Sequence, residues 1–166
     1  MTKPPAKFDA TLMATILERF IPHCREIGMT MVSATPERTV LKLPYDARLA
    51  GDPETGVLMG GVITTLIDTT GGMSVNMRLG EPTSVATLDL RIDYLRPAKP
   101  GETLFAAAEC YRLTRHVAFV KASAWAGETP EAESNPIAEC LGTFMIGDAS
   151  AASGAVAERP GKGRPA

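Results

Sequence analysis

The sequence predicts an α+β domain in which an antiparallel sheet wraps around one long central helix. Three observations lead to this prediction. Residues 59–79 form a long apolar segment with helical periodicity, strand-like runs precede and follow it, and turn-forming residues separate those runs. Because one helix and several antiparallel strands each have an apolar face to bury, we expect the sheet to cover the helix.

Length and composition indicate a single domain. The chain has 166 residues, of which 45% are hydrophobic and 22% are charged, which is enough for a substantial core. We assign residues 1–147 to this domain. Residues 148–166 are rich in Ala, Gly, Ser and Pro and cannot bury a core, so we predict a disordered tail.

The first expected element is one short amphipathic helix. Asp9 is suited to cap its N-terminus, and Pro22 marks its end. Its apolar residues recur three or four positions apart: Met13, Ile16, Leu17 and Phe20.

Two strands and a loop are expected next. Residues 28–34 and 39–43 read as strands, with turn residues between them. Residues 44–58 read as a loop, because Asp, Gly and Pro are dense around residues 51–56.

The central helix begins at Met59-Gly60-Gly61 and ends before Gly80. Gly71 and Gly72 each lower helix stability by about 1 kcal/mol against Ala, which makes sense if a sheet packs closely on this segment. The residues that form its wide apolar face are Val62, Ile63, Leu66, Ile67, Thr70, Met73 and Met77.

The remaining chain predicts four strands. The first alternates between an apolar face, which ends in Tyr94, and a polar face, which includes Thr87. Regular alternation points Thr87 away from the central helix, unless a bulge or a subunit contact intervenes. The four expected strands are residues 85–95, 104–113, 117–126 and 137–146.

Charge and composition exclude several classes of partner. The formal net charge is −2 and the basic residues are scattered, which argues against a nucleic-acid partner. No secretory signal is visible, and no apolar stretch approaches the roughly 18 residues of a membrane span, so we expect a cytoplasmic protein with no membrane contact. The three cysteines form no close pair, which predicts reduced thiols and no metal site.

Two features of the central helix can carry chemistry. Asp68 lies within an apolar run, where a carboxylate needs either structural hydrogen bonds or a functional role. At the start of the helix, Gly60 and Gly61 leave backbone N–H groups open to an anionic ligand, although a glycine pair is also typical of a flexible junction. Neither His23 nor His116 belongs to a catalytic motif.

The segment from Gly56 to Asp68 resembles the signature of hotdog-fold thioesterases of the phenylacetate-degradation type, which are similar to 4-hydroxybenzoyl-CoA thioesterase. In that family a loop ends in His-Gly-Gly, and an Asp follows seven residues after the last Gly. Gly61 and Asp68 keep this spacing, and residues 87–98 resemble the strand and turn that follow. The resemblance implies a hotdog fold and hydrolysis of an aryl- or acyl-CoA thioester.

The resemblance also implies roles for individual residues. Asp68 would be the nucleophile or the general base, and the Gly60 N–H would form the oxyanion hole. Substrate-binding roles would fall to Gly61, Met59, Asp52 and Thr87, with Thr87 holding the water near the carboxylate. Met59 replaces the family's His, and Asp52 stands near the place of a loop Asn.

The spacing of Gly60 and Asp68 predicts a composite site. Eight residues separate them, which is about 12 Å along a helix, whereas both groups must reach the same reacting carbonyl. We therefore expect a homodimer in which Gly60 of one chain meets Asp68 of the other, and the family implies that such dimers can pair into a homotetramer. Thioester hydrolysis requires no metal or redox cofactor, and coenzyme A enters only as part of the substrate.

Three alternatives stay open at this point. A non-catalytic acyl-CoA-binding hotdog protein is favoured by Met59 in place of the family's His. A hotdog hydratase would want a His beside the Asp on the central helix, and this helix has none. A ligand-responsive DNA regulator would want an added basic helix-turn-helix region, which is missing.

Overall fold

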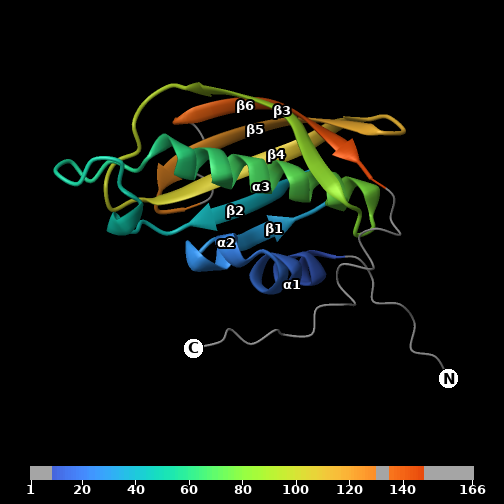
Figure 1. The fold of residues 1–166 in the computed structure, drawn as a ribbon, viewed down its shortest axis with the longest axis horizontal. Coiled ribbons are helices and arrows are strands. Elements are labelled where there is room, and N and C mark those ends of the chain that lie inside the picture. The colour runs from blue at the N-terminus through green and yellow to red at the C-terminus, as the bar shows by residue number, and fades with distance from the viewer. Residues whose placement is uncertain (1–8, 130–134, 148–166) are drawn as a thin grey trace, which may run out of the picture.

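The computed structural model describes residues 9–129 and 135–147 (Figure 1). The six strands of this part form one antiparallel sheet in the order β1-β2-β4-β5-β6-β3. The helices are α1 (Ala10–Phe20), α2 (Pro22–Glu26), a short 3-10 turn (Ala47–Leu49) and α3 (Gly60–Leu79). The strands are β1 (Thr30–Ala34), β2 (Thr39–Leu43), β3 (Val85–Tyr94), β4 (Thr103–Leu113), β5 (Val117–Gly127) and β6 (Ala138–Ile146).

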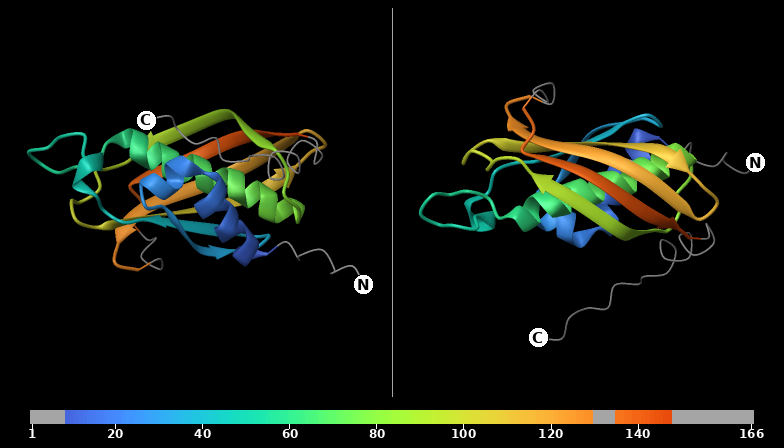
Figure 2. Two further views of the ribbon diagram at one scale, coloured as in Figure 1. Left: turned by 60° about the horizontal axis from the view of Figure 1, so that its bottom comes forward. Right: turned by 90° about the horizontal axis from the view of Figure 1, so that it is seen from above.

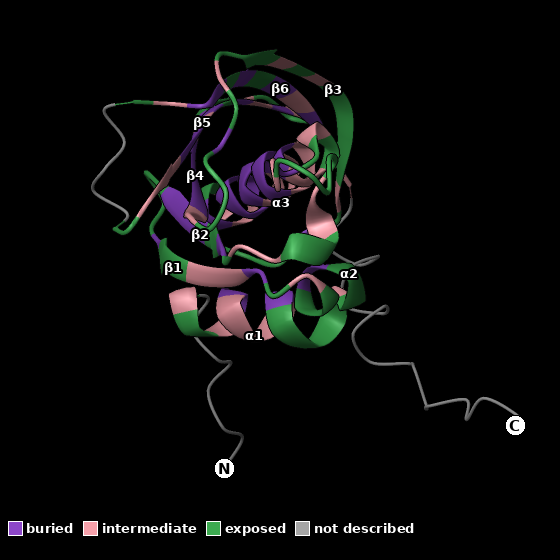
Figure 3. Cartoon of the chain, turned by 90° about the vertical axis from the view of Figure 1, so that its left-hand side faces the viewer, coloured by how far each residue is buried: buried purple, intermediate pink, exposed green. Residues whose placement is uncertain are grey.

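The expected α+β architecture is confirmed, because the sheet curves around α3 (Figures 2 and 3). Leu66, Ile67 and Val75 of α3 are fully buried. The same core takes in Met13 and Leu17 of α1, which packs against β1. The predicted tail at residues 148–166 lies outside the described residues.

The N-terminal helical region differs from the prediction in one respect. We expected one helix that ends at Pro22, but Pro22 is the first residue of a second short helix, α2. Proline suits that position because the first N–H of a helix needs no intrahelical acceptor and the ring presets a helical φ. A proline that follows a helix can therefore end that helix and also begin a new one.

No helix within residues 9–129 and 135–147 combines the length and the apolar character that a membrane span requires. Cys24, Cys110 and Cys140 are all buried free thiols in the structure. Burial raises the pKa of each of these thiols, so they stay protonated at neutral pH.

The sheet packs most closely on α3 at Gly71. A Cβ atom built at Gly71 would lie 2.9 Å from Cζ of Phe144 on β6, closer than carbon atoms approach without a shift. At the next residue, Gly72, the nearest atom of Phe144 would lie 3.8 Å away, which is ordinary contact. The expected close approach of helix and sheet is therefore confirmed at Gly71 and not at Gly72.

We predict opposite effects of alanine at these two glycines. Gly71→Ala should lower the free energy of unfolding by about 1–2 kcal/mol, because the buried Phe144 ring has little room to move and overpacking outweighs the gain in helix propensity. Gly72→Ala should raise it by up to about 1 kcal/mol. Urea denaturation of both variants checks this, and equal shifts would contradict the packing argument.

Candidate active site

Asp68 lies midway along α3, is half-buried and faces the edge strand β3. The hydroxyl of Thr87 on β3 donates to Asp68 Oδ1 over 2.7 Å. Thr64 and Thr65, which lie one turn before Asp68 on α3, donate instead to the carbonyl oxygens of Gly60 and Gly61. Across residues 9–129 and 135–147, Thr87 is the one hydrogen-bond donor to this carboxylate, so Oδ2 is left for a ligand.

Thr87 reaches Asp68 because β3 contains a bulge. Thr87 pairs with Phe144 of β6 and Asp89 pairs with Thr143, so Leu88 is an extra residue with no partner in the ladder. The extra residue shifts the alternation, and both Thr87 and Tyr94 therefore point toward α3. Regular alternation would point Thr87 away from the helix, and the bulge, one of the two exceptions that the sequence left open, is the physical reason that it does not.

A cavity of about 310 Å³ adjoins the Asp68 carboxylate. Asp68 and Thr87 form its polar wall, and much of the rest is apolar, including Met13, Ile16, Met73 and Phe144. The charge of the same carboxylate also affects the thiol of Cys140 on β6. Burial first, and then the negative charge of Asp68 and other nearby carboxylates, raises the pKa of this thiol to about 11.

The start of α3 presents open backbone N–H groups. Met59 precedes the helix and provides no side-chain cap, and its own side chain is 61% exposed. The first N–H groups of any helix lack intrahelical acceptors, so those of Gly60 and Gly61 are available to an anion. A Cβ atom at Gly61 would meet nothing within 4 Å, so the approach is open.

Tyr94 anchors this start of α3, and the sequence did not reveal that role. Its hydroxyl donates to the Gly60 carbonyl oxygen over 2.9 Å and lies 2.7 Å from the hydroxyl of Thr64. The alternation of β3 marked Tyr94 only as an apolar-face residue. An aromatic residue with a polar end on that face was the available signal.

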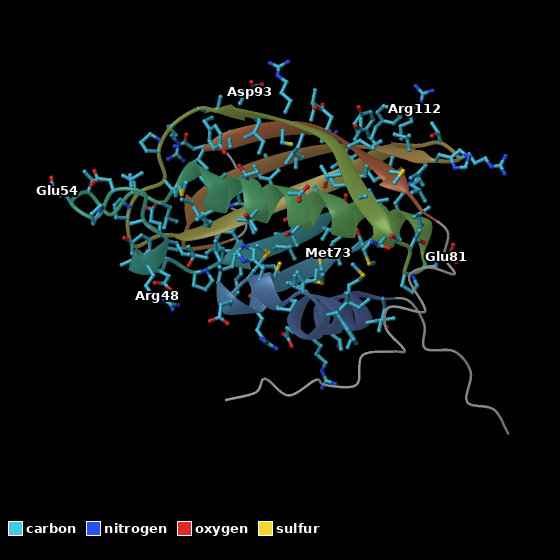
Figure 4. All side chains as sticks on the ribbon, viewed as in Figure 1. Arg48, Glu54, Met73, Glu81, Asp93 and Arg112 are labelled. Atoms are coloured by element: carbon cyan, nitrogen blue, oxygen red, sulfur yellow. The ribbon has the colours of Figure 1, made fainter. Side chains whose placement is uncertain are left out.

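The structure keeps Gly60 and Asp68 apart within one chain, since both belong to the straight helix α3 at the spacing of about 12 Å. Asp52 is held elsewhere: its carboxylate accepts from the Thr55 hydroxyl and the Glu54 N–H, and these bonds lower its pKa. Figure 4 places Glu54 at the tip of its loop, far from Met73. Asp52 therefore stabilises a turn in this chain.

Chemically, the site pairs a carboxylate that has an unused oxygen with an adjoining apolar cavity. Such a carboxylate can attack a carbonyl carbon or take a proton from water. Within the described residues, no group of three or more His, Cys, Asp and Glu side chains is placed to hold a metal ion. His23 on α2 and His116 in the β4–β5 turn do not line the cavity.

Comparisons with known proteins show the family to which the chain belongs. A family profile described as the thioesterase superfamily matches residues 55–133, which include Gly60, Asp68 and Thr87. A Halobacterium salinarum protein named "Putative esterase" is 32% identical, over 84% of this chain and 95% of its own. The chain belongs to the thioesterase superfamily.

Other thioesterase superfamily comparisons extend this result. The medium/long-chain acyl-CoA thioesterase YigI of Escherichia coli is 27% identical over 76% of this chain and 86% of its own. A crystal structure from Pseudomonas aeruginosa is 40% identical with a TM-score of 0.69, covering 80% of this chain and 98% of that one. The E. coli PaaI protein of the phenylacetic acid degradation operon, at 17% identity, shares the fold with a TM-score of 0.70, over 84% of this chain and 94% of its own. The predicted hotdog fold is confirmed.

We predict that Tyr94→Phe loosens the first turn of α3. Removing one hydrogen bond to the Gly60 carbonyl costs about 1 kcal/mol locally, so amide hydrogen exchange at residues 62–65 should quicken about fivefold. Tyr111→Phe is the matched control, because the Tyr111 ring packs against Phe119 instead. Unchanged exchange in the Tyr94 variant would show that Tyr94 does not hold the helix start.

Proposed function

We propose that this thioesterase superfamily member hydrolyses acyl-CoA thioesters with Asp68 as its catalytic carboxylate. The observation that carries the proposal is that Asp68 keeps an unbonded oxygen beside an apolar cavity while Thr87 holds its other oxygen. The name of the E. coli relative YigI, a medium/long-chain acyl-CoA thioesterase, supports a coenzyme A ester as substrate.

The chemistry needs only a positioned oxygen nucleophile and a site for negative charge. Asp68 Oδ2 either takes a proton from a water that attacks the thioester carbon, or attacks that carbon itself to form an anhydride that water then cleaves. In both routes the carbonyl oxygen becomes an oxyanion, the C–S bond breaks, and the departing thiolate of coenzyme A takes up a proton. No metal or redox cofactor takes part in either route.

The Gly60 N–H is the group that we assign to the oxyanion. It lies at the N-terminus of a 20-residue helix, where the aligned peptide dipoles favour negative charge. A single chain separates Gly60 from Asp68 by about 12 Å, and donors must come within about 3 Å of the oxyanion. The Gly60 that serves Asp68 must therefore come from a second chain.

A homodimer through β3 would satisfy this requirement. β3 is a ten-residue strand at the edge of the sheet, with one side unpaired, and Leu88 on it is 55% exposed. The unpaired N–H and C=O groups of a long edge strand are a template for pairing with another chain. Isologous pairing would place two copies of α3 in opposite directions and form two composite sites. Pairing of two dimers into a tetramer stays a prediction.

Removal of either proposed group should abolish turnover without unfolding the protein. Asp68→Asn should lower kcat about a thousandfold. Gly60→Pro should lower it about 10²–10³-fold, because proline lacks the N–H. Proline fits the first helical position, and Met59 before it already has the extended conformation (φ −61°, ψ 137°) that proline demands. Thiol release from an acyl-CoA panel measures both effects.

Gly60→Ala is the matched control for Gly60→Pro. Alanine keeps the N–H, and its Cβ would make ordinary contact with the Tyr94 hydroxyl at 3.4 Å. Near-native activity is expected for it. Equal losses in the alanine and proline variants would remove the Gly60 N–H from the mechanism.

Mixed dimers test the composite site directly. A dimer purified with one Asp68→Asn chain and one Gly60→Pro chain holds one intact site, so it should recover about half of the native activity. A site built within one chain would leave the mixed dimer inactive. If the native protein binds acyl-CoA but releases no thiol, it is a non-catalytic binding protein, the alternative that Met59 favours.

A further inference from the structure

We propose that the cavity beside Asp68, which residues of α1 and α3 line, binds a straight aliphatic acyl chain of medium length. The inference rests on the proposed hydrolysis of acyl-CoA thioesters, and it names the acyl group. It is carried by the shape, the walls and the size of the cavity.

The cavity extends along α3 from the proposed catalytic group. Along α3 its wall runs from Asp68 through Gly72 to Asn76, all on one side of the helix. Eight residues of α-helix span about 12 Å. A thioester carbonyl at Asp68 would therefore direct its acyl chain along α3 toward Asn76.

At the far end of the cavity, the polar atoms of Asn76 already have hydrogen-bond partners within the chain. Asn76 Oδ1 accepts from the Thr83 N–H over 2.7 Å, and Asn76 Nδ2 donates to the Gly72 carbonyl oxygen over 3.3 Å. Because these polar atoms are paired within the chain, an apolar chain end can lie against them without leaving them unsatisfied.

The side walls are largely apolar, with the ring of Phe144 on β6 and several flexible aliphatic side chains. Met13, Ile16 and Ile21 come from the N-terminal helical region, and Met73 and Val85 face them from α3 and β3. Methionine fits irregular and mobile chains because its three rotatable bonds adjust to them. Gly72 contributes no side chain midway along the wall, and a Cβ atom there would make only ordinary contact with Phe144 at 3.8 Å.

Two independent measures give the same chain length. A cavity of about 310 Å³ holds about ten small groups at the roughly 30 Å³ of one water molecule. Consecutive Cα atoms of an extended peptide are joined by three bonds and lie about 3.8 Å apart, so an extended chain advances about 1.2 Å per bond. A length of about 12 Å therefore accommodates about ten bonds of an acyl chain. Both point to about eight to twelve carbons. A benzoyl or phenylacetyl group would leave the far part of the cavity empty.

Binding and turnover should both reveal this limit. Non-hydrolysable S-alkyl-CoA thioethers should bind the native dimer about fourfold more tightly per added methylene, up to about ten carbons and with no gain beyond. In the thiol-release assay kcat/KM should follow the same profile, and decanoyl-CoA should exceed benzoyl- and phenylacetyl-CoA by at least about tenfold.

Two substitutions should move the limit in opposite directions. Gly72→Leu fills the middle of the cavity and should shorten the preferred chain by about four carbons, while leucine favours the helix. Ile16→Ala enlarges the wall from α1 and should extend the preferred chain. Leu12→Ala is the matched control, because Leu12 belongs to α1 and is not among the residues that line the cavity.

The outcomes separate this inference from the proposed function. Thioether binding that depends on length and shifts with Gly72→Leu or Ile16→Ala, but without any hydrolysis, would support the cavity assignment and overturn the enzymatic proposal. Hydrolysis with no preference for decanoyl over benzoyl groups, or with a length profile that both variants leave unmoved, would overturn the cavity assignment alone. Absence of both binding and hydrolysis would overturn both.

Discussion

The close packing of α3 on the curved sheet is the constraint on which the candidate site depends. At Gly71 the helix lies so near Phe144 of β6 that a single methyl group has no room. This contact fixes the depth and rotation of α3 in the sheet. One side of the helix is thereby sealed in the core, and Asp68 is held at the boundary between core and solvent, where its carboxylate is half-buried.

The edge strand β3 connects both ends of the proposed chemistry to this helix. Thr87 bonds the carboxylate of Asp68, and Tyr94 bonds the backbone that carries the Gly60 N–H. A strand without a bulge would point one of these two side chains away, because Thr87 and Tyr94 differ by an odd number of positions and side chains alternate along a strand. The extra residue Leu88 lets one strand serve both groups. The same strand has the free edge that a second chain would need.

Most of the fold could be predicted from the sequence because its elements follow local patterns. The strand at residues 39–43 matches β2, and the other strands agree within one or two residues at each end. Asp68 and Gly60 could be singled out because a carboxylate in an apolar run and a glycine pair before a helix are local anomalies. Their separation along one helix also followed directly from residue spacing.

Contacts between segments distant in sequence could not be predicted in the same way. Whether Thr87 faces Asp68 depends on the register between β3 and β6, in which Thr87 pairs with the distant residue Phe144, and a one-residue shift reverses it. The cavity likewise exists only because α1 packs opposite Met73. The sequence by itself determined which elements form and which residues can react, since periodicity and residue chemistry are local. The tertiary structure alone decided which of them meet, since strand register and helix packing depend on the whole chain.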